Sequence, residues 1–160
     1  MTELKQKQLE TWKKRPHSWS QHSQFRDYSK EDWYKRYVLG ERLATTKEID
    51  FGSAVDKRIQ ADPAYIPQIP RGTSLQHTIT LEFGEHKITG LFDIYDENEV
   101  FIGEIKTGKA EWDQSRVDNH GQITMYCLLL YLNNNIVPDT VKLKLYWLPT
   151  EERQDFSIGF

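Results

Sequence analysis

The stretch from residue 75 to residue 108 constrains the fold most, because it reads as three strands joined by two short turns. The runs at 75–83, 86–96 and 99–108 are rich in β-branched and aromatic residues, and "GE" and "EN" stand between them. Short polar or glycine-containing loops between such runs are typical of β-hairpins. We therefore expect three consecutive antiparallel strands.

Helical patterns surround these strands. Within 18–41, Ser29 and Asp32 form a capping pair and Gly40 is a natural stop, so we expect a helix between them. Three prolines at 62–72 predict an irregular surface crossing, because they cannot sustain a helix or a central strand. The other expected elements are helices at 2–15, 50–60 and 113–135, and a last strand at 140–148.

Composition limits the partners and the setting. The net charge is −3, from 21 basic and 24 acidic residues, so any nucleic-acid surface must be local. The single cysteine, Cys127, excludes an internal disulfide and a multi-cysteine metal site within this chain. The stretch at 1–10 is polar, so we expect no apolar leader, and no apolar run approaches the roughly 18 residues of a membrane span. We expect a cytoplasmic protein, or one of the host cell cytoplasm if viral, with no membrane partner.

The second and third strands carry charges where apolar residues dominate. A two-residue loop at "EN" sets Asp93 opposite Ile102, so Asp93, Glu104 and Lys106 share one face. Leaving a carboxylate uncompensated in a central strand costs several kcal/mol, on the order given by transfer data. Two interpretations stay open: ordinary solvent-side charges, or half of a site where oxygen ligands hold a hard divalent cation.

The segment 30–37 alternates aromatic and basic side chains. Such interleaving suits nucleic acid, because rings stack on bases and cations meet phosphates. A helix that packs its aromatic side chains inward and its lysines outward has the same pattern. Both interpretations stay open.

Taken in order, these features resemble the PD-(D/E)XK nuclease superfamily, and within it the RecB-like branch of RecB/AddB-type nuclease domains. The resemblance rests on Asp93 in "GLFDIYD", Glu104 and Lys106 in "GEIKTGK", and Gln122 and Tyr126 in "QITMY". It extends upstream through "FRDYSKEDWYKRYVLGE" and "FGSAVDKRI", and so covers nearly the whole chain. Four signals in one order are more specific than the acid and lysine pattern alone.

The resemblance implies an α/β fold with a restriction-endonuclease-like core. In that core a helix is followed by three antiparallel strands, a helix and a strand, here with extra N-terminal helices. It implies a single nuclease domain at 1–160, with an N-terminal helical segment at 1–45 and a catalytic core at 46–150.

The function implied is that of a divalent-metal-dependent deoxyribonuclease, with magnesium or manganese as cofactor. It would hydrolyse phosphodiester bonds of DNA in recombination, repair, or phage and mobile-element DNA processing, beside a helicase or recombinase partner. Exonuclease and endonuclease action both stay open. The residues implied are Asp93, Glu104 and Lys106 for catalysis; Asp56, Asp93, Glu104 and the backbone carbonyl of Ile105 for the metal; and Gln122, Tyr126 and Lys109 for the substrate.

Two positions depart from the family. Asp56 stands where the family's helix carries a histidine, and its carboxylate offers oxygen to magnesium or manganese at least as readily. Tyr28 stands where iron–sulfur members place a cysteine, and the C-terminal cysteines are also missing. We therefore expect no iron–sulfur cluster.

Two alternatives remain beside the nuclease interpretation. A DNA-binding or accessory module that kept the fold without the reaction would be marked by loss of either acid or of the lysine, and all three are present. Gln122 and Tyr126, one helical turn apart, also fit a helix that packs its tyrosine on a sheet.

Overall fold

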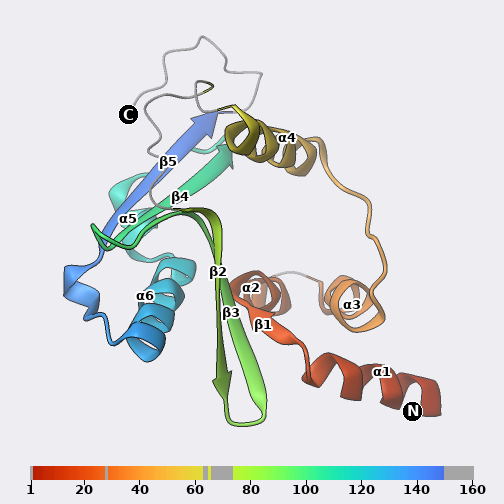
Figure 1. Ribbon diagram of the computed structural model, residues 1–160. Helices are drawn as coiled ribbons and strands as arrows, with labels where there is room; N and C mark the ends of the chain where they lie inside the picture. The colour runs from red at the N-terminus through yellow and green to blue at the C-terminus, as the bar shows by residue number, and fades with distance from the viewer. Residues whose placement is uncertain (1, 28, 63–64, 66–73, 150–160) are drawn as a thin grey trace. The chain divides into compact units, whose positions relative to one another are not determined.

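The computed structural model describes residues 2–27, 29–62, 65 and 74–149. Position 28 and most of the predicted crossing at 62–72 lie outside the described residues. The elements labelled in Figure 1 and the short turns between them follow in the order α1 (Glu3–Lys13), β1 (Pro16–Ser18), α2 (Trp19–Asp27), α3 (Lys30–Trp33), the π-helical turn η1 (Tyr34–Leu39), α4 (Lys47–Ala61), β2 (Ser74–Phe83), β3 (His86–Asp96), β4 (Phe101–Gly108), α5 (Gln114–Asp118), α6 (Gly121–Asn134), the 3-10 turn η2 (Pro138–Thr140) and β5 (Lys142–Pro149).

The strands form a mixed sheet, and the predicted run of three strands is confirmed as β2, β3 and β4. β2 pairs with β3 across the predicted "GE" turn, where Gly84 has φ +60°, a conformation that glycine adopts without steric cost. β4 is antiparallel to β3 and parallel to β5. The sequence pattern missed β1, a three-residue strand that pairs in parallel with the first residues of β3.

The predicted loop between β3 and β4 is wrong by two residues. Asp96 pairs with Phe101 and Ile94 with Gly103, so the connection has four residues and the next step of the register sets Asp93 opposite Glu104, not Ile102. The carboxylate of Asp96 explains the longer turn, because it accepts from the backbone N–H groups of both residues 98 and 99. A shift of two residues preserves the face of every side chain, so the shared face of Asp93 and Glu104 survives the error.

The predicted helix at 113–135 is wrong as a single element. It consists of α5 and α6, which are separated at Asn119 and His120. Asp113 caps the start of α5 by accepting from the N–H of Arg116 at 2.7 Å. Asn119 ends it, because its side-chain amide donates to the carbonyl of Ser115 at 2.8 Å and competes with continued helix.

The predicted capping signals near residue 30 are confirmed. Ser29 Oγ accepts from the N–H of Asp32 at 3.2 Å, and Gly40 ends the segment with φ +75°. The helix between them is α3 followed by the π-helical turn η1, and the preceding helix α2 had no clear sequence signal. Local capping chemistry thus fixed the ends, while the helical pitch between them depended on packing.

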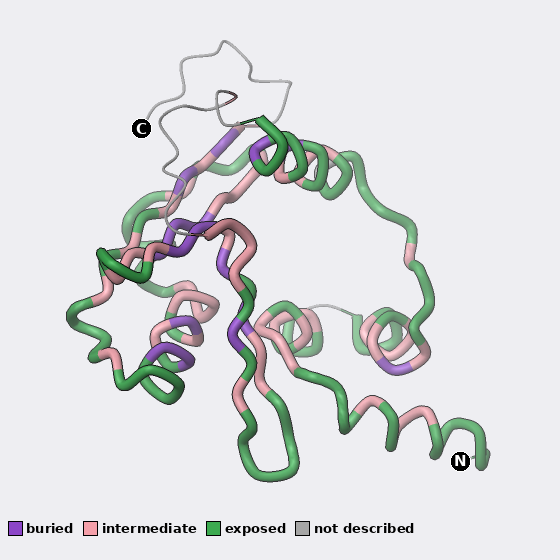
Figure 2. Tube along the Cα trace, in the orientation of Figure 1, coloured by how far each residue is buried: buried purple, intermediate pink, exposed green. Residues whose placement is uncertain are grey.

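The described chain divides into two compact units, each formed by separate stretches of sequence. The first consists of Met1–Ala44, Thr78–Gly90 and Gly121–Asn135. Its buried residues include one face of α6, visible as purple turns in Figure 2. Gly90 leaves room for the α6 side chains, because a Cβ at this position would stand 2.6 Å from Leu129 Cδ1.

The second unit consists of Thr45–His77, Leu91–His120 and Ile136–Phe160. The predicted helix at 50–60 is confirmed as α4, and Val55 and Ile59 on it are buried against side chains of β3, β4 and β5. The hydrophobic core of this unit contains Val55, Ile59, Ile94, Tyr146 and Leu148. Gly52 permits the contact of α4 with β4, because a Cβ on it would stand 2.8 Å from Thr107 Oγ1. The assignment of residues 1–160 to one domain stays a prediction.

Among the described residues, none of the helices has both the length and the apolar character that crossing a bilayer requires.

Candidate functional site

Asp93 lies on β3, in the second unit, with its carboxylate directed at the neighbouring strand. Its Oδ2 accepts from the backbone N–H of Ile105 at 2.8 Å, so the side chain bonds a strand N–H in the way a partner backbone would. This bond holds the carboxylate beside β4 in a half-buried position. Asp93 is therefore fixed by the backbone of the element that carries Glu104 and Lys106.

Asp56 comes to the same place from α4. Oδ1 of Asp56 and Oδ1 of Asp93 both accept from one nitrogen, Nε2 of Gln76, at 3.1 and 3.2 Å. Oδ2 of Asp56 accepts from Gln60 Nε2, one turn further along the helix, at 3.0 Å. The structure thus brings Asp56, as predicted, close to Asp93, and one hydrogen-bond donor bridges the two carboxylates.

Gln76 is the residue that sequence reasoning missed. It lies in β2 with φ +53°, in the left-handed region that non-glycine residues rarely adopt. Such strain persists only where the surroundings impose it, and it is common at functional sites. Nothing in "SLQHTI" announced this role, because it depends on a bend in the strand and on two acids that are distant in sequence.

Glu104 and Lys106 stand two residues apart on β4, as predicted. The Lys106 Nζ atom lies 2.5 Å from Glu104 Oε1. Glu104 is only 2% exposed, and its burial makes this ammonium important, because a buried carboxylate without compensation is strongly destabilising. Pairing of β4 with β5 from Phe101 to Gly108 keeps the backbone under both residues rigid.

The environment of Asp93 disfavours its charge. Burial raises the pKa of Asp93 above its ordinary value of 3.8, and the nearby charge of Asp56 acts in the same direction. The N–H of Ile105, the charge of Lys106 and the Gln76 amide oppose this rise in pKa without cancelling it. A carboxylate held in this way gains from any additional positive charge close to it.

His120, which the sequence gave no reason to select, lies near the same pair. Its pKa is lowered, chiefly by burial and also by the positive charges of Lys106 and Arg116. The ring packs edge-on against Trp112, with centroids 4.9 Å apart, and the Arg116 guanidinium covers Trp112 at 4.0 Å. A neutral imidazole therefore stands near Lys106 at neutral pH.

The three predicted substrate residues are divided between the two units. Gln122 and Tyr126 are both on α6, in the first unit, where Gln122 Nε2 donates to the Tyr126 hydroxyl. Tyr126 is buried in that unit's own core, as the packing interpretation requires. Lys109 is exposed just after β4, in the second unit. A substrate role for the three residues stays a prediction.

The acidic side chains Asp56, Asp93 and Glu104 of the second unit are of the chemical type that binds a hard cation. Among the described residues, no three His, Cys, Asp or Glu side chains are grouped so as to hold a metal ion. Two carboxylate oxygens nevertheless converge on one polarised N–H donor, and the third acid pairs with an ammonium group. The Gln76 amide and the Lys106 ammonium therefore each lie against carboxylate oxygens. Oxygen is the ligand type that magnesium and manganese prefer.

Comparison with known proteins adds one solved structure. The chain is similar to the crystal structure of a protein from Eubacterium rectale named "Putative exonuclease", with a TM-score of 0.59 and 16% sequence identity. The likeness covers 93% of this chain and 72% of that chain. At this identity it concerns the fold. No family model matches the sequence, and no curated protein matches it either.

Proposed function

We propose that this protein is a divalent-metal-dependent nuclease of the RecB-like branch of the PD-(D/E)XK superfamily, acting on DNA. The observation that carries the proposal is the convergence of Asp56 and Asp93 on Gln76, in the unit that also holds the Glu104–Lys106 pair. The similarity of the fold to a protein named as an exonuclease supports it. The order in which Asp93, Glu104 and Lys106 follow one another in the sequence also supports it.

The acids would hold the cation that the reaction needs. Asp56, Asp93 and Glu104 would supply carboxylate oxygens, and the backbone carbonyl of Ile105 would supply a fourth. Bound magnesium or manganese would acidify a water molecule and offset charge on the phosphate. Asp93 is suited to this role because the Ile105 N–H already orients its carboxylate.

Lys106 would act on the reacting phosphate. In the structure its ammonium neutralises Glu104, and once Glu104 has another cationic partner the ammonium could turn toward the substrate. There it would orient the attacking water or offset the developing negative charge. His120, with its lowered pKa, would stay neutral and so would not add to the positive charge around Lys106.

The proposal is tested by cleavage of end-labelled DNA. Linear and circular substrates, each single- and double-stranded, are incubated with the protein in magnesium, manganese or excess chelator. We expect cleavage only with a divalent ion, because the buried acids are useful together only when their charge is compensated. Comparing linear with circular substrates separates exonuclease from endonuclease action.

Variants distinguish the site from a contaminating nuclease. Glu104→Gln keeps the shape of a 2% exposed side chain and removes its charge, so it should abolish cleavage. Asp50→Asn, an exposed acid on α4, is the matched control and should cleave normally. Cleavage that survives chelation, or that is equal in both variants, would refute the proposal.

A further inference from the structure

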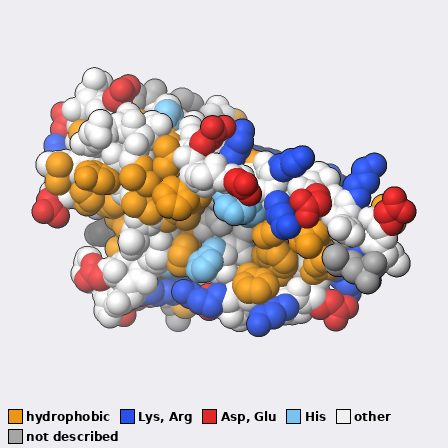
Figure 3. Space-filling model, turned by 90° about the horizontal axis from the view of Figure 1, so that it is seen from below, with side chains coloured by type: hydrophobic (Ala, Val, Ile, Leu, Met, Phe, Trp, Pro, Cys, Tyr) orange, Lys and Arg blue, Asp and Glu red, His pale blue; other side chains and the backbone are white. Residues whose placement is uncertain are grey.

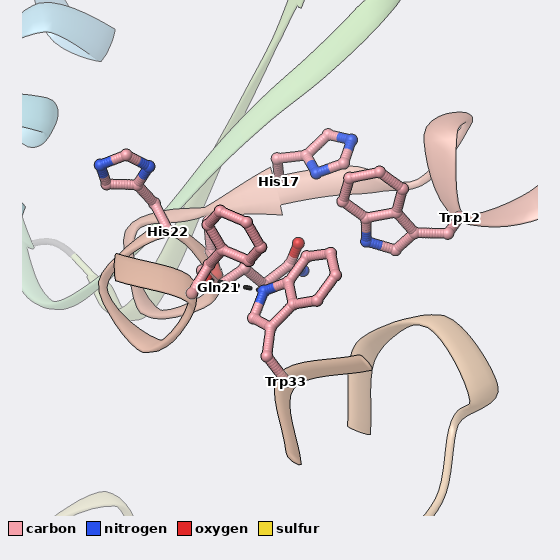
Figure 4. A pocket seen from close by; sticks show the side chains of 7 residues that line it. Trp12, His17, Gln21, His22 and Trp33 are labelled. Carbon is pink, nitrogen blue, oxygen red and sulfur yellow. Dashed lines mark hydrogen bonds between the residues drawn. The ribbon is translucent and has the colours of Figure 1, made fainter. Parts of the chain in front are cut away.

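The first unit contains a pocket that the proposed nuclease site does not use. Its lining residues all come from β1, α1, α2 and α3, and its volume is about 330 Å³, at the small end of the roughly 300–1,000 Å³ of ligand pockets. Figure 4 shows the rings of Trp12 and His17 on one side and that of Trp33 opposite them. The pocket is therefore walled mainly by aromatic rings.

The rings meet edge to face and so do not stack on one another. Trp12 lies at 78° to Trp33 with centroids 5.2 Å apart, and at 82° to His17 at 4.7 Å. Phe25 meets Trp33 at 67° and 4.9 Å. The Trp33 indole is held in place because its Nε1 donates to the carbonyl of Gln21 at 2.9 Å. Each edge-to-face contact covers one face of one ring, and the opposite face of that ring is where a flat aromatic ligand would stack.

Polar atoms of the same residues lack partners. Trp12 Nε1, His17 Nε2 and Gln21 Oε1 are buried, and no other group in the described part of the chain bonds to them. Gln21 Nε2 donates to the carbonyl of Pro16 at 3.3 Å, which leaves the oxygen as the acceptor without a partner. Each such atom costs about 1–3 kcal/mol. They are a donor, an acceptor and an imidazole nitrogen that can be either, and a ligand would reach them by displacing the side chains that cover them.

Positive charge lies beside these rings. Lys30 Nζ stands 5.3 Å from the centre of the Phe25 ring, and the exposed residues Lys14 and Arg15 lie close after Trp12, while Lys13 pairs with Glu10 at 2.9 Å. In Figure 3, hydrophobic side chains lie next to histidines and are bordered by Lys and Arg side chains, with Asp and Glu side chains among them. The surroundings thus favour an anion attached to a flat ring.

We infer that this aromatic pocket (Trp12, His17, Gln21, Phe25 and Trp33) binds an unpaired nucleobase of single-stranded DNA. A base presents two π-faces for stacking and an edge that carries both donors and acceptors. The negative charge of the adjacent phosphate is complementary to the positive charge of Lys30. The unpartnered atoms favour a base over an apolar side chain, which could satisfy none of them. The inference relies on the proposed function only for the source of the base.

Indole N–H signals in two-dimensional NMR test the inference without cleavage. The chain has five tryptophans, and therefore five such signals. Titration with dAMP or dCMP in excess chelator should shift those of Trp12 and Trp33 and leave that of Trp147 in the second unit in place. Deoxyribose 5-phosphate, which has the phosphate but no base, should leave all five in place.

Variants measure the contribution of the ring to binding. Trp12→Ala should weaken binding of a 12-nucleotide single strand by about 5- to 150-fold, the equivalent of one stacked base. Trp12→Phe keeps a ring without the N–H and should lose less. Phe83→Ala removes an aromatic side chain that is 61% exposed in the same unit and should bind normally. Dispersed indole signals in each variant confirm that it is folded.

Three results would overturn the inference. They are unchanged Trp12 and Trp33 signals at millimolar nucleotide, equal shifts with deoxyribose 5-phosphate, and saturation by N-acetyl-leucine amide as readily as by nucleotide. None of these results bears on metal-dependent cleavage, so the nuclease proposal is tested independently of this inference. If the protein binds bases and does not cleave DNA, the assignment of the pocket as a base-binding site still holds.

Discussion

Asp56 and Asp93, which are 37 positions apart in the sequence, accept hydrogen bonds from the same nitrogen, Nε2 of Gln76, at 3.1 and 3.2 Å. The amide offers each acid a partial positive charge and holds the two carboxylates at a common point. Gln76 achieves this with a backbone φ of +53°. The candidate site therefore stores strain in β2 in order to hold acids from α4 and β3 together.

The backbone strain at Gln76 predicts a reversed order of substitutions. Gln76→Gly should be more stable than Gln76→Ala by about 1 kcal/mol, because glycine adopts positive φ without a Cβ clash. At Thr78, an exposed position of the same strand with no positive φ, alanine should be the more stable of the two. Free energies of unfolding from urea denaturation measure both pairs. The same order at both positions would contradict strain at residue 76.

Loss of the ammonium at Lys106 should affect stability as well as activity. Lys106→Met should abolish cleavage and lower the free energy of unfolding by about 3–5 kcal/mol without metal, the usual cost of breaking a buried pair. The reason is that Glu104, at 2% exposure, would lose the cation that offsets the cost of burying an acid. Denaturation and cleavage assays measure the two effects.

A double variant separates these two effects. Adding Glu104→Gln to Lys106→Met replaces the buried acid by a neutral amide of the same shape, so most of the stability should return while cleavage stays absent. If Lys106→Met is as stable as the unmodified protein, the pair does not compensate the buried carboxylate. If it cleaves at the normal rate, the catalytic assignment of the lysine is wrong.

Asp56 should contribute to metal affinity more than to folding. Asp56→Ala should weaken binding of manganese, followed by calorimetry, by about tenfold or more, and Asp56→His should restore part of it by supplying another metal-binding side chain. Asp50→Ala, on the exposed face of the same helix, is the control. Equal manganese affinity in the Asp56→Ala and Asp50→Ala proteins would remove Asp56 from the ligand set.

The raised pKa of Asp93 predicts how stability and metal binding depend on pH. Because the folded state holds the proton more tightly than the unfolded state, the stability from this group is fully present below pH 3.8 and is lost as the pH rises through the folded pKa. Carbon-13 signals of the carboxyl group should titrate above 3.8 without metal. Magnesium should lower that midpoint, since it binds the ionised form. A midpoint at or below 3.8 without metal would contradict the desolvation that the structure shows.

The contact of Gly52 with Thr107 predicts overpacking. Gly52→Ala should destabilise the protein by about 1–2 kcal/mol net, because the clash outweighs the better helix propensity of alanine. Ser53→Ala, exposed on the same helix, should be neutral or stabilising. Thr107→Ala combined with Gly52→Ala should recover the loss. Thermal unfolding measures all of them, and a stabilised Gly52→Ala protein would show that α4 does not approach β4 so closely.

The strands and the shared face of the acids could be predicted from the sequence. Strand patterns, the "GE" turn and the caps at Ser29 and Gly40 depend on residues that are neighbours along the chain. The face of Asp93, Glu104 and Lys106 was right although the loop was wrong, because side chains alternate with a period of two and the error was two residues.

Tertiary structure alone decided how the acids are held. Gln76 bonds to partners 17 and 20 residues away, through a backbone conformation that no local pattern in β2 indicated. The pocket around Trp12 and Trp33 likewise required separate elements to place their rings edge to face. Short-range patterns determine the elements because their energies involve adjacent residues. A site built from distant side chains depends on packing, which a linear pattern does not encode.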